Sequence, residues 1–355
     1  MQEVSSVAGS TAPSRGRWGV STSNLVRYYA VANRILAFQG ADEPVLNLVH
    51  SFLSGYYFTP TKFSAEGPPP AHLIDIHRAP DSLPQPETAG FPIEDGYCYP
   101  EEEQLTLVVN GSTIVVGPPE QNRTDIWLVE ETAGLHPLAL NNVILYAVQA
   151  ALRRAGLYQF HSGCVLADEN DSGVLIVGDS GSGKSTLTVS LLNEGWRFVS
   201  DDNLLLHDSQ NGITAWALRQ YFTFDEPTLR ACNLLRFADV IGSRLPSDPD
   251  KLRFYARRAF PESFTETCVP GVILFPSIST EIKSRLESIK PADALMRLLR
   301  QCPWATCDAA AAPAHLALLA KLASQTRSYS LIAGSDVFAN PNSITELLKT
   351  TNQTS

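Results

Sequence analysis

The segment VLIVGDSGSGKSTLTVSLLNEGWRFVSDD, residues 174–202, contains an apolar strand, a glycine-rich loop, a helix and a second apolar strand. This order is typical of α/β proteins, in which ligands bind at the carboxyl ends of the strands. The segment therefore predicts an α/β fold with a ligand site at the loop.

The loop matches the pattern G-x-x-x-x-G-K-[ST]. Its residues are Gly178, Asp179, Ser180, Gly181, Ser182, Gly183, Lys184, Ser185 and Thr186. In such a loop the backbone N–H groups wrap the phosphates of a nucleoside triphosphate, Lys184 reaches the β and γ phosphates, and the Ser185 hydroxyl ligates Mg²⁺. A glycine-rich surface turn is the alternative. The strand before the loop and the helix after it, whose leucines can face a sheet, favour nucleotide binding.

Two aspartates, Asp201 and Asp202, end the strand that follows the loop helix. Adjacent residues on a strand point to opposite faces. One carboxylate can therefore contact the metal or its waters while the other faces an acceptor hydroxyl and takes its proton. Alternatively, the pair begins a turn or caps a nearby element.

A histidine, His161, stands at the start of the strand that precedes the loop strand. A single histidine is more often structural than catalytic. Its position beside the loop and the aspartates makes a catalytic role equally reasonable.

Three motifs in this order, His161-Ser-Gly, the GDSGSGKST loop and the strand ending in Asp201-Asp202, resemble the catalytic domain of HPr kinase/phosphorylase and its relatives. That family has a P-loop nucleotide-binding fold similar to phosphoenolpyruvate carboxykinase. The resemblance implies that Lys184 and Ser185 bind ATP and Mg²⁺ and that Asp201 deprotonates a serine hydroxyl. Asp202 and His161 would support it, with Asp202 as a further metal ligand.

The chain also departs from that family. Thr186 stands where HPr kinase has an acidic residue, and ALRQYFTFDE, residues 217–226, replaces the later glycine-rich signature. HPr as the substrate and the reverse phosphorolysis are therefore open. Several basic residues that could contact phosphate follow the aspartates: Arg219, Lys251, Arg253, Arg257 and Arg258. For the four within residues 250–260, the alternative is that they lie on a solvated helix face.

These residues bear on three functions. The first is an ATP-dependent kinase that phosphorylates a serine hydroxyl of a small protein, a peptide or a small molecule. The second is a non-catalytic ATP-binding regulatory module. A phosphoenolpyruvate carboxykinase is disfavoured because its metal-ligating Lys and His groups have no counterpart here. Members of the family assemble as oligomers, so the resemblance also implies a homo-oligomer.

The domain organisation follows from composition and periodicity. We expect a disordered tail over residues 1–16, a β-rich α+β N-terminal domain over 17–135 and a catalytic domain over 136–350. A hairpin at Asn110-Gly111 and a helix over 42–53 are expected in the second part. The third part begins with a helix over 137–154, in which apolar residues recur at helical spacing.

Composition narrows the partners. The 355-residue chain carries a net charge of −10, which argues against a nucleic-acid partner. No apolar stretch reaches the eighteen residues of a membrane helix, and the N-terminus lacks the apolar region of a signal peptide. Six scattered cysteines fit reduced thiols. We therefore expect a cytoplasmic protein without a membrane partner.

Overall fold

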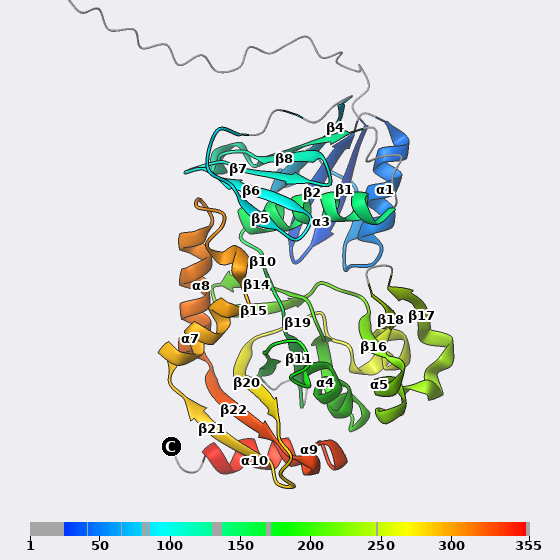
Figure 1. Ribbon diagram of the computed structural model, residues 1–355, viewed down its shortest axis with the longest axis vertical. Helices are drawn as coiled ribbons and strands as arrows, with labels where there is room; N and C mark the ends of the chain where they lie inside the picture. Colours follow the sequence, from blue (N-terminus) through cyan, green and yellow to red (C-terminus); the bar gives the residue numbers. More distant parts are fainter. Residues whose placement is uncertain are drawn as a thin grey trace, which may run out of the picture.

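The computed structural model describes residues 25–40, 42–64, 66–79, 83, 86–129, 137–167, 172–245 and 248–352. It is a mixed α/β structure with four sheets. The tail expected over residues 1–16 lies outside the described residues. Figure 1 shows the N-terminal sheet above the three other sheets.

The N-terminal sheet has nine strands in the order β3-β1-β2-β4-β9-β8-β7-β6-β5. They are β1 (Leu25–Val31), β2 (Arg34–Gly40), β3 (Thr59–Thr61), β4 (His72–Ala79), β5 (Phe91–Ile93), β6 (Gly96–Pro100), β7 (Leu105–Val109), β8 (Ser112–Val116) and β9 (Arg123–Val129). The expected hairpin joins β7 to β8, and Asn110 and Gly111 have φ values of 48° and 80°. Positive φ at both positions is what a type I′ turn requires.

Two helices pack against this sheet. Helix α1 (Glu43–Leu53) confirms the helix expected over 42–53. The Asp42 side chain caps its N-terminus by accepting a hydrogen bond from Val45 N at 3.0 Å. Helix α3 (Pro137–Arg154) has the expected bounds, and its buried residues belong to the same core as the N-terminal strands. The division into domains at residue 136 stays a prediction.

The central sheet has six strands in the order β13-β11-β12-β20-β22-β21. They are β11 (Gly163–Leu166), β12 (Gly173–Ile176), β13 (Arg197–Ser200), β20 (Pro270–Ile278), β21 (Arg285–Ile289) and β22 (Arg327–Ala333). Strands β12, β20 and β22 are parallel, whereas β11 is antiparallel to both of its neighbours. Helix α4 (Lys184–Asn193) follows β12, and its leucines join the core of this sheet.

Two smaller sheets flank the central one. The first has the order β10-β14-β15-β19 and the second β16-β18-β17. Their strands are β10 (Tyr158–Phe160), β14 (Leu204–Ser209), β15 (Gly212–Ala217), β16 (Phe222–Asp225), β17 (Ile241–Leu245), β18 (Asp248–Phe254) and β19 (Thr267–Cys268). Because β18 is a strand, the interpretation of residues 250–260 as a helix face is wrong for Lys251 and Arg253. Arg257 and Arg258 do lie in a short helix, α6 (Ala256–Ala259).

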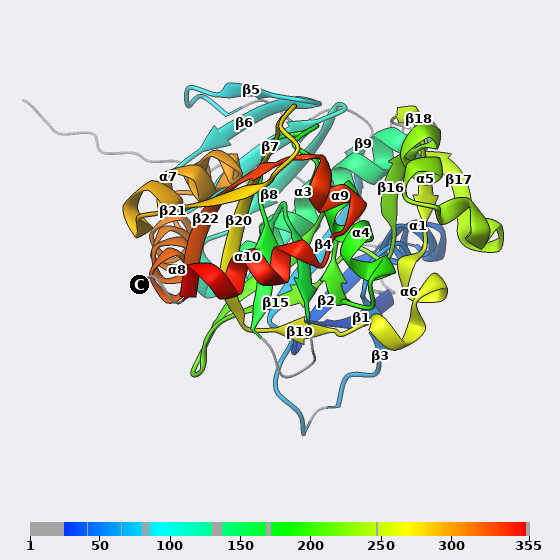
Figure 2. The same ribbon diagram turned by 90° about the horizontal axis from the view of Figure 1, so that it is seen from below.

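The remaining helices lie around the central sheet. They are α5 (Glu226–Ala231), α7 (Pro291–Arg300), α8 (Ala312–Gln325), α9 (Ser335–Ala339), α10 (Ser343–Asn352) and the 3₁₀ turns η2 (Leu234–Val240), η3 (Pro261–Ser263) and η4 (Pro303–Ala305). The 3₁₀ turn η1 (Pro119–Gln121) instead joins β8 to β9 in the N-terminal sheet. Figure 2 shows α9 and α10 nearest the viewer when the molecule is seen from below. Among the described helices, none is long and apolar enough to cross a bilayer.

Candidate functional site

The sheet topology brings three sequence motifs to one edge. The glycine-rich loop follows β12 and the aspartate pair follows β13, while His161 precedes β11, which lies between them and runs the opposite way. The start of an antiparallel strand lies beside the ends of its neighbours. Gly163 at this start packs tightly, because an added Cβ would lie 2.6 Å from Thr188 Oγ1.

The glycine-rich loop turns back on itself before α4. Gly181 and Gly183 have φ values of 79° and 92°, a region that other residues rarely adopt. Lys184 opens the helix, and its Nζ donates hydrogen bonds to the carbonyl oxygens of Gly178 at 2.8 Å and Asp179 at 3.0 Å. Burial lowers the pKa of Lys184, against the pull of the nearby aspartates. The ammonium therefore lies against the backbone of the loop, where the charges of Asp202, Asp201 and Asp179 act on it.

Asp201 is the buried member of the aspartate pair. It is 1% exposed, and neither of its carboxylate oxygens accepts a well-aligned hydrogen bond from the described residues. Burial and the neighbouring Asp202 raise its pKa to about 7, although the hydroxyls of Ser185 and Thr188 lie close enough to favour the charged form. Unsatisfied carboxylate oxygens beside a hydroxyl fit a hard cation such as Mg²⁺. These residues could therefore hold the metal that the loop pattern predicts.

Asp202 is the accessible member of the pair. Its Oδ1 lies 3.1 Å from His161 Nε2, and its Oδ2 forms an ion pair with Arg219. Burial lowers the pKa of His161, although the charge of Asp202 opposes this effect. The Arg219 guanidinium lies over the Tyr221 ring at 5.2 Å. Asp202 thus faces polar groups on the open side, whereas Asp201 faces α4.

The other basic candidates divide into two kinds. Arg253, Arg257 and Arg258 lie over aromatic rings, at 5.2 Å from Tyr221, 4.6 Å from Phe264 and 4.7 Å from Tyr255 respectively. Lys251 pairs with Asp248 at 3.4 Å and also lowers the pKa of Lys184. Lys251 and Arg219 are therefore the two candidates that act electrostatically on the site.

Two side chains at the site were missed from the sequence. Gln301 Nε2 donates a hydrogen bond to Asp179 Oδ1 at 2.8 Å. Asn203 Nδ2 lies 3.4 Å from Asp202 Oδ2, and its Oδ1 accepts from Gln159 at 2.5 Å. Asn203 directly follows the aspartate pair, and this position could have indicated from the sequence that it belongs to the site. Gln301 lies 122 residues from Asp179, and no local pattern connects them.

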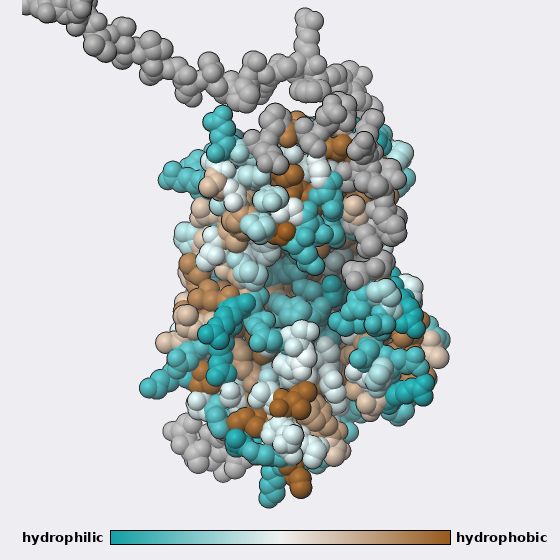
Figure 3. Space-filling view, in the orientation of Figure 1, coloured by the Kyte–Doolittle hydropathy of each residue, from teal (hydrophilic) through white to brown (hydrophobic). Residues whose placement is uncertain are grey.

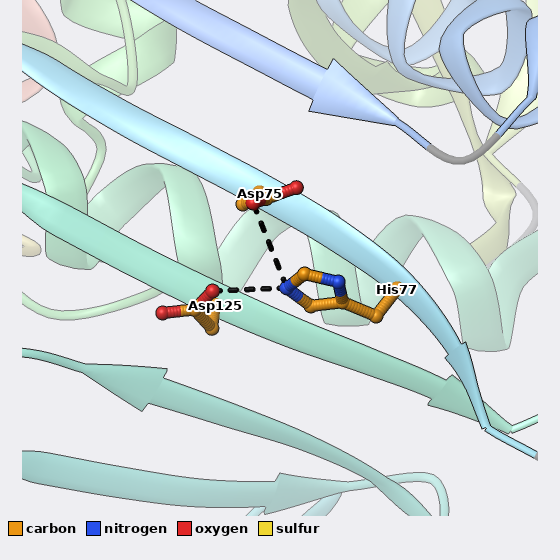
Figure 4. A group of neighbouring side chains, drawn as sticks. All are labelled: Asp75, His77 and Asp125. Atoms are coloured by element: carbon orange, nitrogen blue, oxygen red, sulfur yellow. Dashed lines mark hydrogen bonds and ion pairs between the residues drawn. The ribbon is translucent and has the colours of Figure 1, made fainter. Parts of the chain in front are cut away.

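A second polar cluster lies on the N-terminal sheet (Figure 4). His77 Nε2 is 2.9 Å from Asp125 Oδ1 and 3.7 Å from Asp75 Oδ2. One imidazole and two carboxylates are a donor set that could hold a metal ion. The Arg123 guanidinium, however, donates to Asp75 at 2.6 Å and to Asp125 at 2.7 Å. Because a cation already compensates both carboxylates, we interpret the cluster as an ion-pair network.

The surface between the upper sheet and the lower sheets is hollowed and hydrophilic on the face that Figure 3 shows. Contacts join the N-terminal part to the rest of the chain, since Gln220 Nε2 donates to Tyr56 O at 2.6 Å and Tyr56 forms a bridge with Arg219. The N-terminal segment around Tyr56 therefore reaches the arginine that pairs with Asp202.

Comparisons with known proteins give little. No family model matches the chain, and no curated protein matches it. Among solved structures, the HPr(Ser) kinase/phosphatase from Coxiella burnetii has a TM-score of 0.28 and 13% sequence identity, and the match covers 55% of this chain and 97% of that chain. The chain thus has a weak structural similarity to that kinase/phosphatase, and membership of its family stays a prediction.

Proposed function

We propose that this protein is an ATP-dependent phosphotransferase that acts on a hydroxyl group. The observation that carries the proposal is the meeting of Lys184, Asp201 and Asp202 at one edge of the central sheet. The charges of both aspartates act on the Lys184 ammonium. The carboxylate oxygens of Asp201 are buried beside Ser185 and accept no well-aligned hydrogen bond from the described residues. These are the groups that positioning a triphosphate and a metal requires.

The surroundings of the two aspartates favour an exchange of the roles that the resemblance implies. Asp201, buried beside Ser185, is suited to hold Mg²⁺, which would supply charge neutralisation to the phosphates when bound. Asp202, which is 20% exposed and next to His161, is suited to accept the proton of an acceptor hydroxyl. Arg219 holds the Asp202 carboxylate in place from the other side.

The proposed step is a direct displacement. The acceptor hydroxyl oxygen forms a bond to the γ-phosphorus of ATP while its proton passes to Asp202. The bond between the γ-phosphorus and the oxygen bridging to the β-phosphate breaks, and ADP leaves with that electron pair. Lys184 neutralises charge on the β and γ phosphates throughout.

The test is transfer of the γ-phosphoryl group from ATP to hydroxyl-bearing acceptors, followed by ³¹P NMR for a phosphate ester. Asp202→Asn should reduce the transfer rate at least 100-fold while ATP still binds. Asp208→Asn is the matched control, because Asp208 is an exposed aspartate of β14 that pairs with Lys321. Equal transfer by both variants would remove Asp202 from the chemistry.

A non-catalytic ATP-binding module is the second candidate. The observation that favours it is the ion pair between Asp202 and Arg219, which occupies the carboxylate that would have to accept a proton. Tight binding of ATP with no phosphate ester formed on any acceptor would support the module.

A further inference from the structure

A partly open cavity of about 190 Å³, lined by both polar and apolar side chains, adjoins the proposed phosphotransfer site. Its walls come from the end of α3, from β10, from η4 and from the start of α8. Figure 1 shows α8 rising beside these strands to the level of α3. Three of its lining residues also contact the site: His161 and Asn203 touch Asp202, and Gln301 touches Asp179.

The cavity lies against an excess of buried positive charge. Arg153 lines it, is 5% exposed and lies 3.9 Å from Asp308, while the adjacent Arg154 binds the same carboxylate at 2.8 Å. Two guanidiniums thus share one carboxylate, and the described residues that line the cavity include no acid. A buried charge without compensation is costly. One positive charge beside the cavity is therefore left for a monoanion.

Two of the lining residues also carry buried polar atoms without partners. Arg153 Nε has no hydrogen-bond partner among the described residues, and neither ring nitrogen of His315 has one. His315 is 2% exposed and stacks on Tyr158 at 4.5 Å. Burial, together with Arg153, lowers its pKa to about 4, so the ring is neutral at pH 7 and offers one donor and one acceptor. Buried polar atoms without partners are rare and call for a ligand or a water.

The size of the cavity limits the ligand. A cavity of about 150 Å³ holds the six carbon atoms of benzene, so about 190 Å³ accommodates roughly eight non-hydrogen atoms. Arg153 and His161 both line this cavity. One end would then pair with the guanidinium while the other end comes beside Asp202.

We infer that this cavity binds the phosphoryl acceptor and that the acceptor is a small hydroxyl-bearing monocarboxylate. The carboxylate pairs with Arg153, and the hydroxyl lies at His161 and Asp202. A carboxylate matches the single uncompensated charge better than a phosphate dianion does. The role as acceptor rests on the proposed function, whereas binding of the monocarboxylate does not.

The test measures binding and transfer separately. Isothermal titration with D-glycerate, L-lactate, propionate, glycerol and inorganic phosphate, each without nucleotide, asks which groups the cavity recognises. The first two carry a hydroxyl and a carboxylate, propionate lacks the hydroxyl, and glycerol lacks the carboxylate. Transfer from MgATP to each probe is then followed by ³¹P NMR.

We expect glycerate or lactate to bind at one site and to be phosphorylated, glycerol not to bind, and propionate to bind without reaction. Arg153→Met should weaken binding at least tenfold. Gln149→Trp fills part of the cavity without changing its charge and should also weaken binding at least tenfold. This second variant keeps the test decisive if the arginine variant does not fold. Arg236→Met is the matched control, because Arg236 also lies over an aromatic ring, Phe237, at 4.8 Å.

Absence of carboxylate binding in a protein that binds MgATP would overturn this inference and leave the proposed function intact. Tighter binding of inorganic phosphate than of any carboxylate, or binding unchanged in both variants, would also overturn it. Carboxylate binding without any nucleotide binding would instead refute the proposed function and, with it, the role of the ligand as acceptor.

Discussion

Replacing Asp201 by asparagine should stabilise the nucleotide-free protein while destroying its metal-dependent function. The carboxylate is buried beside the charge of Asp202, with only Lys184 and the hydroxyls of Ser185 and Thr188 to favour ionisation, and its pKa is about 7. Asparagine has nearly the shape of the protonated acid and never ionises. The variant therefore avoids the cost of a buried charge.

The magnitude follows from the pKa. In the unfolded chain the carboxyl has its ordinary pKa of 3.8, so the folded value of about 7 is raised. Because the folded pKa is the higher one, the natural protein is most stable at low pH, where Asp201 is protonated in both states, and it loses stability as pH rises from 3.8 towards 7. The loss of folding free energy, relative to low pH, is about 2 kcal/mol at pH 5 and about 4 kcal/mol at pH 8.

Urea unfolding at pH 5 and pH 8, without nucleotide, measures the effect. The free-energy advantage of Asp201→Asn over the natural protein should widen by about 2 kcal/mol between these two pH values. Saturating MgATP should then stabilise the natural protein more than the variant, because a ligand stabilises the folded state in proportion to the logarithm of its affinity. Asp208→Asn should show neither effect.

An Asp201→Asn variant that is destabilised equally at both pH values would refute the reasoning. Such a result would mean that the carboxylate is a satisfied structural group rather than a charge kept for a cation.

Two further perturbations test the surroundings of the site and the N-terminal sheet. Gly163→Ala should weaken MgATP binding at least tenfold, as measured by equilibrium dialysis, because the new methyl group would lie 2.6 Å from Thr188 Oγ1 and displace the helix of the loop. Asp125→Asn should lower the free energy of unfolding by about 1–3 kcal/mol at pH 7. Burial raises the pKa of Asp125, but His77 and Arg123 outweigh it and the net pKa is lowered, so this stability should be lost from the natural protein as pH falls through that pKa.

The sequence was sufficient for the parts that depend on short-range order. About forty residues contain His161, the glycine-rich loop, its helix and the strand that ends at Asp201-Asp202. The alternation of strand and helix in this segment brings them to one edge of the sheet. The hairpin at Asn110-Gly111 was predictable because few dipeptides adopt positive φ twice.

The cavity could not be predicted because its walls come from distant segments. Arg153 lies in the last turn of α3, where cations are common, so its position alone does not indicate a binding site. Its partner Asp308, the ring of Trp304 at 5.3 Å and His315 all follow about 150 residues later. Strand β18 was missed for a different reason, since its charged residues obscured the pairing with β16 and β17.

The most direct test of the account is the affinity for ATP with Mg²⁺ and with EDTA, measured by isothermal titration on the natural protein and on Lys184→Ala. We expect the natural protein to bind MgATP at least tenfold more tightly than metal-free ATP, and the lysine variant to bind neither. Equal affinities with and without Mg²⁺, or binding that survives the loss of Lys184, would contradict a metal–triphosphate site at this edge of the sheet.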